Sequence, residues 1–454
     1  MAQKQKRNRK KAKRSFFLPI FVVSMFFILM GMIFLGVLSA KEIKKTSEKE
    51  LPVLKISLLN TTLEEIHENE KNIAYGGNQV EIFDGENMVF YDGVEIRGRG
   101  NYSWGVDKKS YRLKFPKKVD LFGMGKKRKW ALIGNFVDDS LMRNDLAYFM
   151  SDVLGGEYKM EGRFVELVID DKDLGVYYLV KTMEVDKQAV DLRDFGGVLV
   201  EVDNVYCEAE EKWWIVRNED CLTLKDVVNK DIADEAMELF VKDYNKFLKA
   251  VDLRDFAEAA KIVDMESFAR YYLLSEFTAN PDAYVTSWFL YRDGVSHRIH
   301  AGPVWDFDAA FGNKSWGNWE EGFYAPMTVM GRFEYTYKKF TSGEEATRFC
   351  PYDKSKKIHE TVKISWVMCD MMEMLEFREL LAEVYMRDFR NKREVIISHI
   401  DEMADLIGAA AQKDAEKWGK GDFGEAVEYL KWWVGKRFDL FDDIVFGKMV
   451  SEEI

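Results

Sequence analysis

The spacing of apolar positions changes character near the middle of the chain. Over residues 51–230, apolar and polar residues alternate in short runs such as "VEIFDG", "SYRLKFP" and "GVYYLVK", which Gly and Asp turns separate. Alternation with a period of two is typical of half-buried strands. One interruption, "DSLMRNDLAYFMSDVL", has helical spacing, with Asp139 or Ser140 as the expected cap. This part of the chain predicts a β-rich lobe with one helix.

Helical spacing dominates residues 231–454. In "DEAMELFVKDYNKFLKAV", "MESFARYYLLSEFTAN" and "GEAVEYLKWWVGKRFDLFDDIV" the apolar residues recur at intervals of three and four. A hairpin-like element, "TSWFLYRDGVSHRIHAGPVWDFD", separates two groups of such runs. We therefore expect an α+β protein with two lobes, a β-rich N-terminal lobe over 51–230 and a helix-rich C-terminal lobe over 231–454.

An uncharged stretch from Ser15 to Ala40 is the strongest signal in the chain. As a helix, it is long enough to cross a hydrocarbon core of about 30 Å. A cleavable signal peptide is the alternative, because "LSA" before Lys41 resembles a cleavage site, but the apolar core of a signal peptide spans only about 7–15 residues. We expect an uncleaved transmembrane anchor over 15–40, followed by a short charged stalk over 41–50.

Charge indicates the orientation of that anchor. Residues 1–14 hold eight of the 66 Lys and Arg of the chain and none of its 78 Asp and Glu. Because flanking positive charge stays inside, we expect a cytoplasmic tail and an extracytoplasmic body on a single-pass protein of the cell membrane. The rest of the chain has a formal charge of −20. Such an acidic body repels phosphate backbones, so nucleic acid is not an expected partner.

The cysteines fall in two pairs that are close in sequence, Cys207 with Cys221 and Cys350 with Cys369. In an exported protein these pairs suit disulfides, although four cysteines allow three pairings. The sequence has no CxxC motif and only five histidines. A zinc site is therefore not expected.

"GPVWDFDAAFG" places Asp306 and Asp308 among aromatic and small residues. Along an extended segment, residues two apart project to the same face. Both carboxylates can then hold one hard cation, while Trp305 and Phe307 pack on the other side. A turn in which the aspartates cap backbone groups is the simpler alternative.

Asp282 follows a helical run in "SEFTANPDAYVTSWFLY". A carboxylate in a short loop ahead of metal-binding acids has the order of base and metal ligand that kinase-type sites use. A plain turn residue is the alternative. Farther upstream, "RGRGNYSWGVDKKSYRLKFP" combines glycines, which permit close approach of a phosphate, with basic countercharge. A simple hairpin with a basic rim has the same pattern.

Six blocks that follow one another in the chain carry a resemblance to a known family. They are "EIRGRGNYSW", "KKSYRLKF", "DDSLMRNDLAYFM", "LGVYYLV", "EFTANPDAYVTSWFLY" and "GPVWDFDAAFG". In this order they resemble the signature blocks of the CotH family, named for a spore coat protein and regarded as atypical secreted protein kinases. The resemblance implies a two-lobed, kinase-like fold that binds ATP with Mg²⁺ or Mn²⁺ and phosphorylates Ser or Thr of surface or coat proteins.

The resemblance also implies roles for single residues. Asp282 corresponds by motif to the catalytic aspartate and Asp306 to the metal-binding aspartate. Asp308, the second acid of that block, is either a further metal ligand or a structural residue. Lys109 and Arg143 are the expected contacts to the phosphates or the nucleotide. Arg97 completes the cofactor-binding set, where its expected role is to orient a neighbouring carboxylate.

Two positions depart from the family pattern. Ser287 stands where family members often carry an asparagine suited to a second metal, and its hydroxyl is a poorer magnesium ligand. Lys181 stands where a glutamate is frequent, although Glu184 is close by. A catalytically impaired binding or structural protein on the same fold is therefore the second hypothesis. A metal-dependent phosphoesterase, the third, lacks the usual His-rich cluster.

Overall fold

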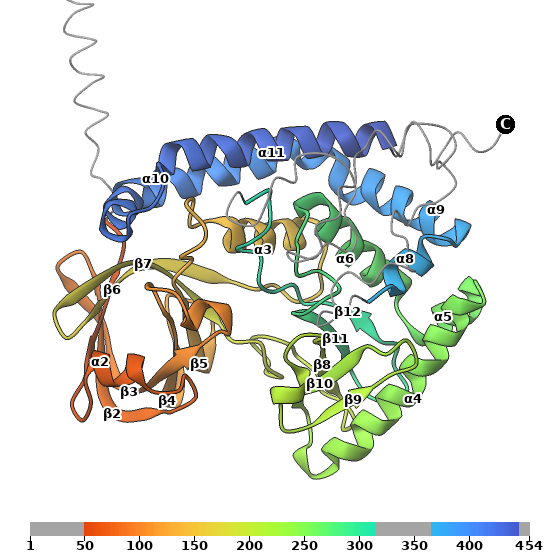
Figure 1. The fold of residues 1–454 in the computed structure, drawn as a ribbon, viewed down its shortest axis with the longest axis horizontal. Coiled ribbons are helices and arrows are strands. Elements are labelled where there is room, and N and C mark those ends of the chain that lie inside the picture. Colours follow the sequence, from red (N-terminus) through yellow and green to blue (C-terminus); the bar gives the residue numbers. More distant parts are fainter. Residues whose placement is uncertain (1–49, 314–364, 445–454) are drawn as a thin grey trace, which may run out of the picture. The chain divides into compact units, whose positions relative to one another are not determined.

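The computed structural model describes residues 50–313 and 365–444. From Leu51 onward the described residues form one compact unit, an α+β fold with a strand-rich N-terminal part and a helical C-terminal part (Figure 1). The predicted anchor, its basic tail and all of the stalk except Glu50 lie outside the described residues. Among the helices of 50–313 and 365–444, none has the length and apolarity that a membrane span needs.

The N-terminal part is a closed barrel of seven strands in the order β1-β2-β3-β4-β5-β7-β6. Neighbouring strands are antiparallel, except that β1 and β6 pair in parallel where the barrel closes. Alternation directs one set of apolar side chains, such as Ile56 and Ile96, to the barrel core. The strands are β1 (Val53–Ser57), β2 (Tyr75–Asp84), β3 (Asn87–Arg99), β4 (Ser110–Asp120), β5 (Lys126–Ile133), β6 (Gly162–Ile169) and β7 (Lys172–Lys181).

A second sheet has five strands in the order β12-β11-β8-β10-β9. Its strands are β8 (Val198–Val202), β9 (Trp213–Ile215), β10 (Cys221–Val227), β11 (Trp288–Arg292) and β12 (His300–Ala301). The antiparallel pairing of β11 with β8 joins strands from both sides of residue 230. The change of periodicity at residue 230 predicts a lobe boundary at that point. Periodicity reports only local structure and does not show which distant strand pairs with which, so the sequence contains no sign that this sheet crosses the boundary.

Helices pack around this sheet to form the larger core. The short α2 (Leu63–Glu68) lies on the barrel; the others are α3 (Arg143–Val153), α4 (Ala233–Asp252), α5 (Phe256–Ile262), α6 (Met265–Thr278), α8 (Val367–Met371), α9 (Leu375–Val384), α10 (Arg393–Trp418) and α11 (Phe423–Ile444). Helices α10 and α11 run side by side (Figure 1). Phe277 of α6 meets Phe438 of α11 edge to face, with ring centroids 4.9 Å apart.

A buried ion pair fixes the barrel to α10. Lys108 Nζ lies 2.6 Å from Asp414 Oδ1, and the two side chains are only 1% and 3% exposed. The same Asp414 oxygen accepts the backbone N–H of Val176 on β7 at 2.8 Å. Lys108 in turn donates to the carbonyl oxygen of Val176 at 2.7 Å. The pair therefore satisfies both backbone groups of one barrel residue.

The expected disulfide between Cys207 and Cys221 is confirmed. It joins a single 3-10 turn, η2 (Cys207–Ala209), to the first residue of β10. Cys369 is also disulfide-bonded, whereas Cys350 lies outside the described residues.

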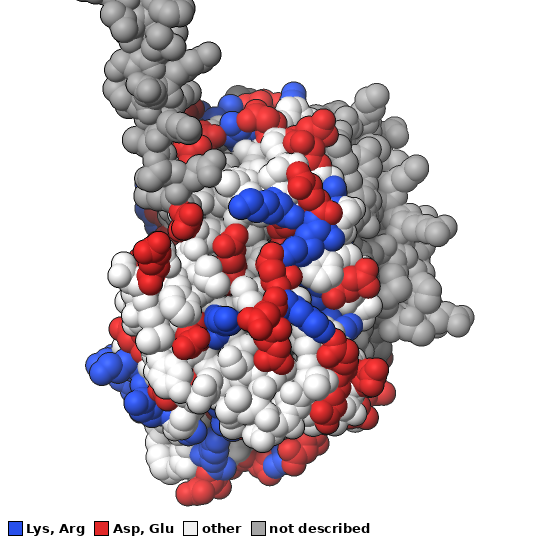
Figure 2. All heavy atoms as spheres, turned by 90° about the vertical axis from the view of Figure 1, so that its left-hand side faces the viewer, with Lys and Arg blue, Asp and Glu red and all other residues white. Residues whose placement is uncertain are grey.

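Charged side chains of both signs intermingle on the surface shown in Figure 2. Exposed ion pairs of the barrel include Lys55 with Asp171 at 3.3 Å and Lys172 with Glu64. Such exposed pairs contribute only about 0–1 kcal/mol each. The stability of the fold therefore depends mainly on its two apolar cores.

Candidate active site

A cavity of about 750 Å³ lies where the β3–β4 region of the barrel faces the second sheet. Its walls come from β3 and β4, from the residues after β5, from β8 and η2, and from two loops at 281–287 and 306–309. Five of the residues singled out from the sequence line it together: Arg97, Asp282, Ser287, Asp306 and Asp308. Segments more than two hundred residues apart in the chain thus meet at one site.

The two acid-bearing loops have unusual backbone conformations. Asp306 has φ 66° and Ser287 has φ 55°, left-handed values that cost non-glycine residues of order 1–3 kcal/mol. Neighbouring side chains hold these loops: Phe307 donates its N–H to Asn144 Oδ1 at 2.7 Å, and Asn280 donates to the carbonyl oxygen of Asp306 at 3.3 Å. Conformations of this kind concentrate at functional sites.

The acidic and aromatic residues of the 305–308 segment separate to opposite sides, as expected. Trp305 and Phe307 are 9% and 1% exposed, whereas Asp306 and Asp308 are partly exposed and line the cavity. However, the segment is not a strand. The left-handed conformation of Asp306, together with the packing of the two aromatic rings, produces the separation that the sequence pattern attributes to an extended chain.

Burial raises the pKa values of Asp282, Asp306 and Asp308, and mutual repulsion adds to this effect for Asp282 and Asp308. Burial raises the pKa of Asp282 to about 7, with further contributions from the charges of Asp306 and Asp203. Burial also raises the pKa of Asp306, against the effect of Arg99. The pKa of Asp308 is raised well above its usual range by burial and then by the other two acids. A cation placed among these carboxylates would relieve their repulsion.

The donor set suits magnesium. No group of three or more His, Cys, Asp or Glu side chains is already gathered around a metal position in the described parts of the chain. Mg²⁺ does not need one, because proteins commonly bind it through one or two carboxylates, with water and phosphate oxygens as the other ligands. Asp306 and Asp308 provide such a carboxylate pair.

Three arginines face the cavity from the barrel side. Arg97 and Arg99 are two apart on β3, and Arg112 on β4 is the cross-strand partner of Arg97. Arg97 donates to Asn72 Oδ1 at 2.6 Å. Burial lowers the pKa of each arginine, and Arg97 and Arg99 lower that of Arg112 further. Within 50–313 and 365–444, the guanidinium groups of Arg99 and Arg112 form no hydrogen bond or ion pair, although Arg99 lies 5.3 Å from the Trp305 ring centroid.

The sequence reasoning missed Arg99 and Arg112. The signal for Arg99 was present in "RGRG", because residues 97 and 99 share one face of a strand. Arg112 joins them only through the pairing register of β3 with β4. Partly buried arginines that lack a protein acceptor and face a cavity are well suited to bind a phosphate or carboxylate group of a ligand.

A buried ion pair on the second sheet was also missed. Glu201 on β8 lies 2.6 Å from Lys225 on β10, and its other oxygen accepts the N–H of Ser287 at 3.0 Å. Burial raises the pKa of Glu201 to about 7 despite the opposing charge of Lys225. The pair links the sheet to the loop that carries Ser287, whose hydroxyl hydrogen-bonds the Asp306 carboxylate.

Two predicted nucleotide contacts are not part of the cavity lining. Lys109 Nζ donates to backbone carbonyls of the turn at 104–106, at 2.7 and 3.2 Å. Arg143 is buried, pairs with Asp138 and donates through Nε to the carbonyl oxygen of Ala310 at 2.9 Å. Asp138 also accepts the N–H of Arg143 at 2.8 Å, in place of the caps expected for α3. Acceptors of the protein itself already bind the donors of both side chains. We therefore infer that Lys109 and Arg143 stabilise loops next to the cavity and do not bind a ligand in it.

Lys181, which stands where the family often has a glutamate, and the nearby Glu184 lie elsewhere on the barrel. Lys181 is buried and lies 3.6 Å from Glu161. Glu184 pairs with Lys127 at 2.6 Å and with Lys129 at 2.9 Å. Neither residue lines the cavity.

The raised pKa of Asp282 predicts that stability falls as pH rises. Its folded-state pKa of about 7 lies above the usual 3.8, so the folded state binds more protons than the unfolded state between these values. The resulting stabilisation is complete below about pH 4 and is lost as pH rises through 7.

Thermal melts at pH 5 and pH 8, without divalent cations, test this. We expect Asp282→Asn to raise the melting temperature at pH 8 and to reduce the difference between the two pH values. The exposed Asp171→Asn is the matched control. An unchanged pH dependence in Asp282→Asn would contradict the prediction.

Together, these observations define an α+β protein in which acids on the second sheet's side and arginines on the barrel's side line one cavity. Residues 96–440 match the model of the CotH kinase protein family, so the chain belongs to the CotH family, as its sequence blocks predicted. The chain is also 26% identical over 224 residues to the inner spore coat protein H of Bacillus subtilis (strain 168). That match covers 48% of this chain and 59% of the relative.

Proposed function

We propose that this protein is an ATP-dependent protein kinase that phosphorylates Ser or Thr. The observation that carries the proposal is the convergence of three acids and three arginines on one cavity: Asp282, Asp306, Asp308, Arg97, Arg99 and Arg112. Phosphoryl transfer asks little covalent chemistry of the protein and depends on positioning and charge. Membership of the CotH family supports the same reaction.

Asp306 and Asp308 would hold Mg²⁺ or Mn²⁺. When bound, the metal would neutralise charge on the phosphates of the nucleotide. Arg97, Arg99 and Arg112 bind the phosphate oxygens from the opposite side, where charge-assisted and bidentate hydrogen bonds are available to them. This assignment explains why Arg99 and Arg112 lack acceptors within the described protein.

Asp282 acts as the base. The acceptor hydroxyl oxygen forms a bond to the γ-phosphorus as the bond to the β,γ-bridging oxygen breaks, and the hydroxyl proton passes to the Asp282 carboxylate. A pKa of about 7 leaves this carboxylate substantially ionised at neutral pH and still basic enough to accept a proton.

We further propose that the reaction takes place outside the cytoplasm, with residues 15–40 anchoring the protein in the cell membrane. The uncharged stretch, the basic tail before it and the disulfide of the body support this location. The name of the Bacillus subtilis relative refers to the spore coat. By analogy, we propose surface or coat proteins as substrates.

Nucleotide binding tests the assignment directly. In the full-length protein, ATP with Mg²⁺ or Mn²⁺ should raise the free energy of unfolding by about 2.7 kcal/mol at a hundredfold excess over Kd, measured by thermal or urea unfolding. Asp306→Asn should remove the metal-dependent part of this gain, and Asp171→Asn should retain it. Absence of stabilisation in the unmodified protein, or full stabilisation of Asp306→Asn, would refute the proposed site.

A binding or structural protein without catalysis is the second candidate. The observation that favours it is Ser287, which stands at the position of the family's second metal ligand. Its N–H donates to Glu201 and its hydroxyl hydrogen-bonds the Asp306 carboxylate, so neither group is free for a metal. This candidate predicts nucleotide binding without transfer. Incubation with γ-labelled ATP and a Ser/Thr protein substrate separates the two, since only the kinase gives label that depends on Asp282.

A further inference from the structure

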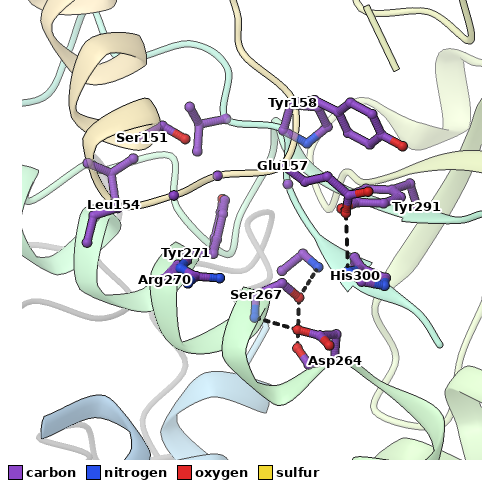
Figure 3. A pocket seen from close by; sticks show the side chains of 17 residues that line it. Ser151, Leu154, Glu157, Tyr158, Asp264, Ser267, Arg270, Tyr271, Tyr291 and His300 are labelled. Carbon is purple, nitrogen blue, oxygen red and sulfur yellow. Dashed lines mark hydrogen bonds and ion pairs between the residues drawn. The ribbon is translucent and has the colours of Figure 1, made fainter. Parts of the chain in front are cut away.

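A second cavity, of about 150 Å³, lies between the C-terminal end of α3, the N-terminal half of α6 and strands β11 and β12 (Figure 3). It shares no lining residue with the larger cavity. The proposed reaction does not use it, although Tyr291 and residues 302–304 belong to two of the six sequence blocks. Its side chains nevertheless come from four separate segments of the chain and surround one space.

One wall of this cavity is aromatic. Tyr158 meets Tyr291 edge to face with ring centroids 4.9 Å apart, and Tyr291 stacks on His300 at 4.9 Å. Tyr271 contributes a further ring to the lining. Aromatic rings present a negative face, and several of them around a small space form a favourable environment for an organic cation.

A carboxylate lies beside these rings. In Figure 3 the Glu157 side chain extends to Tyr291 and His300. Glu157 accepts a hydrogen bond from the Tyr291 hydroxyl and lies 3.6 Å from His300 Nδ1. Burial lowers the pKa of His300, so this ring is mainly neutral at pH 7. Glu157 therefore has no permanently charged partner among the described residues.

The other charges of the lining are neutralised by neighbours. Arg270 pairs with Glu266 at 2.6 Å and with Asp388 at 3.2 Å. Asp264 pairs with Arg298 at 2.7 Å. The charge that remains in the cavity is that of Glu157, and apolar surface is provided by residues that include Leu154, Leu274 and Val304.

We propose that this cavity binds an organic ammonium group, with the cation held by Glu157 and the rings of Tyr158 and Tyr291, and the alkyl part against the apolar wall. The volume suits a small free organic cation, such as a quaternary ammonium compound. A lysine side chain presented by another protein offers the same chemistry. This proposal does not depend on the kinase assignment.

Isothermal titration of the full-length protein with choline tests the site. The control ligand is the uncharged isostere of choline, in which carbon replaces the quaternary nitrogen. We expect choline to bind at least about tenfold more tightly than this alcohol, because only the ammonium gains the carboxylate and cation–π interactions. Equal affinities, or no binding of choline at millimolar concentrations, would overturn the proposal.

Variants then locate the binding. Glu157→Gln and Tyr158→Leu should each weaken choline binding by about tenfold. Tyr158→Phe, which keeps the ring, and Glu238→Gln, an exposed carboxylate on α4 outside the cavity, should bind as the unmodified protein does. Glu157 is 54% exposed, so its replacement should not disturb folding. Unchanged binding in Glu157→Gln would overturn the assignment.

A lysine-containing peptide distinguishes the two sources of the ammonium group. Tighter binding of choline than of the peptide, with both weakened in Glu157→Gln, identifies a small free ammonium compound as the ligand. The reverse order with the same dependence on Glu157 identifies a protein lysine. Peptide binding that is insensitive to Glu157 would contradict the ammonium site.

Discussion

Replacing Asp282 with asparagine is expected to slow phosphoryl transfer by about 10²–10⁴-fold, the usual contribution of a general base. Asparagine keeps the size of the side chain and its capacity for hydrogen bonding but cannot accept the hydroxyl proton. Nucleotide binding should persist, because the metal and phosphate contacts are assigned to other residues. It should even strengthen slightly, since removal of the Asp282 charge reduces repulsion of the phosphates.

The pH profile provides an independent check on this role. Because Asp282 must be ionised to act and its pKa is about 7, kcat/KM should rise with pH through about 7 and then level off. The residual activity of Asp282→Asn should lose this rise. Asp171→Asn, an exposed change on the barrel, should leave both rate and profile unaltered. Full activity in Asp282→Asn would exclude it as the base.

Replacing Asp414 with alanine is expected to destabilise the fold by about 3–5 kcal/mol, the cost of breaking a buried ion pair by removing one partner. Lys108 would remain almost fully buried without a countercharge, and the N–H of Val176 would lose its acceptor. Because this pair connects the barrel to α10, the loss should appear as a lower denaturation midpoint in urea.

A double-mutant cycle separates the ion pair from simple loss of packing. If the unpaired charge causes the damage, Lys108→Met combined with Asp414→Ala should be more stable than Asp414→Ala alone, because no buried charge is then left, even though both backbone groups of Val176 lose a partner. A double variant as unstable as the sum of its single changes would show that the charge pair itself is not responsible.

The types of the elements and many of the site residues follow from the sequence. Alternation predicts barrel strands such as β6 and β7, and helical spacing predicts α4 and α6. Both patterns depend on the local geometry of the chain, with periods of 2 and about 3.6 residues. Ordered motifs likewise indicate Asp282, Asp306 and Asp308, because the spacing of such residues is constrained by the loops that carry them. The sequence also fixes the uncharged stretch over 15–40.

Tertiary structure decides which groups meet. Arg112 reaches the cavity through the β3–β4 register, and strand β8 joins β11 across the expected boundary at 230. Lys109 and Arg143 are basic residues in matching motifs, yet acceptors of the protein itself already bind their donors: backbone carbonyls for Lys109, and the Asp138 carboxylate and a backbone carbonyl for Arg143. Arg99, in contrast, keeps its guanidinium without an acceptor among the described residues. The second cavity, proposed to bind an ammonium group, is likewise lined by segments that are distant in the sequence. The sequence specifies which side chains carry charge. Long-range packing determines whether the hydrogen-bond donors of such a side chain meet an acceptor of the protein or remain available to a ligand.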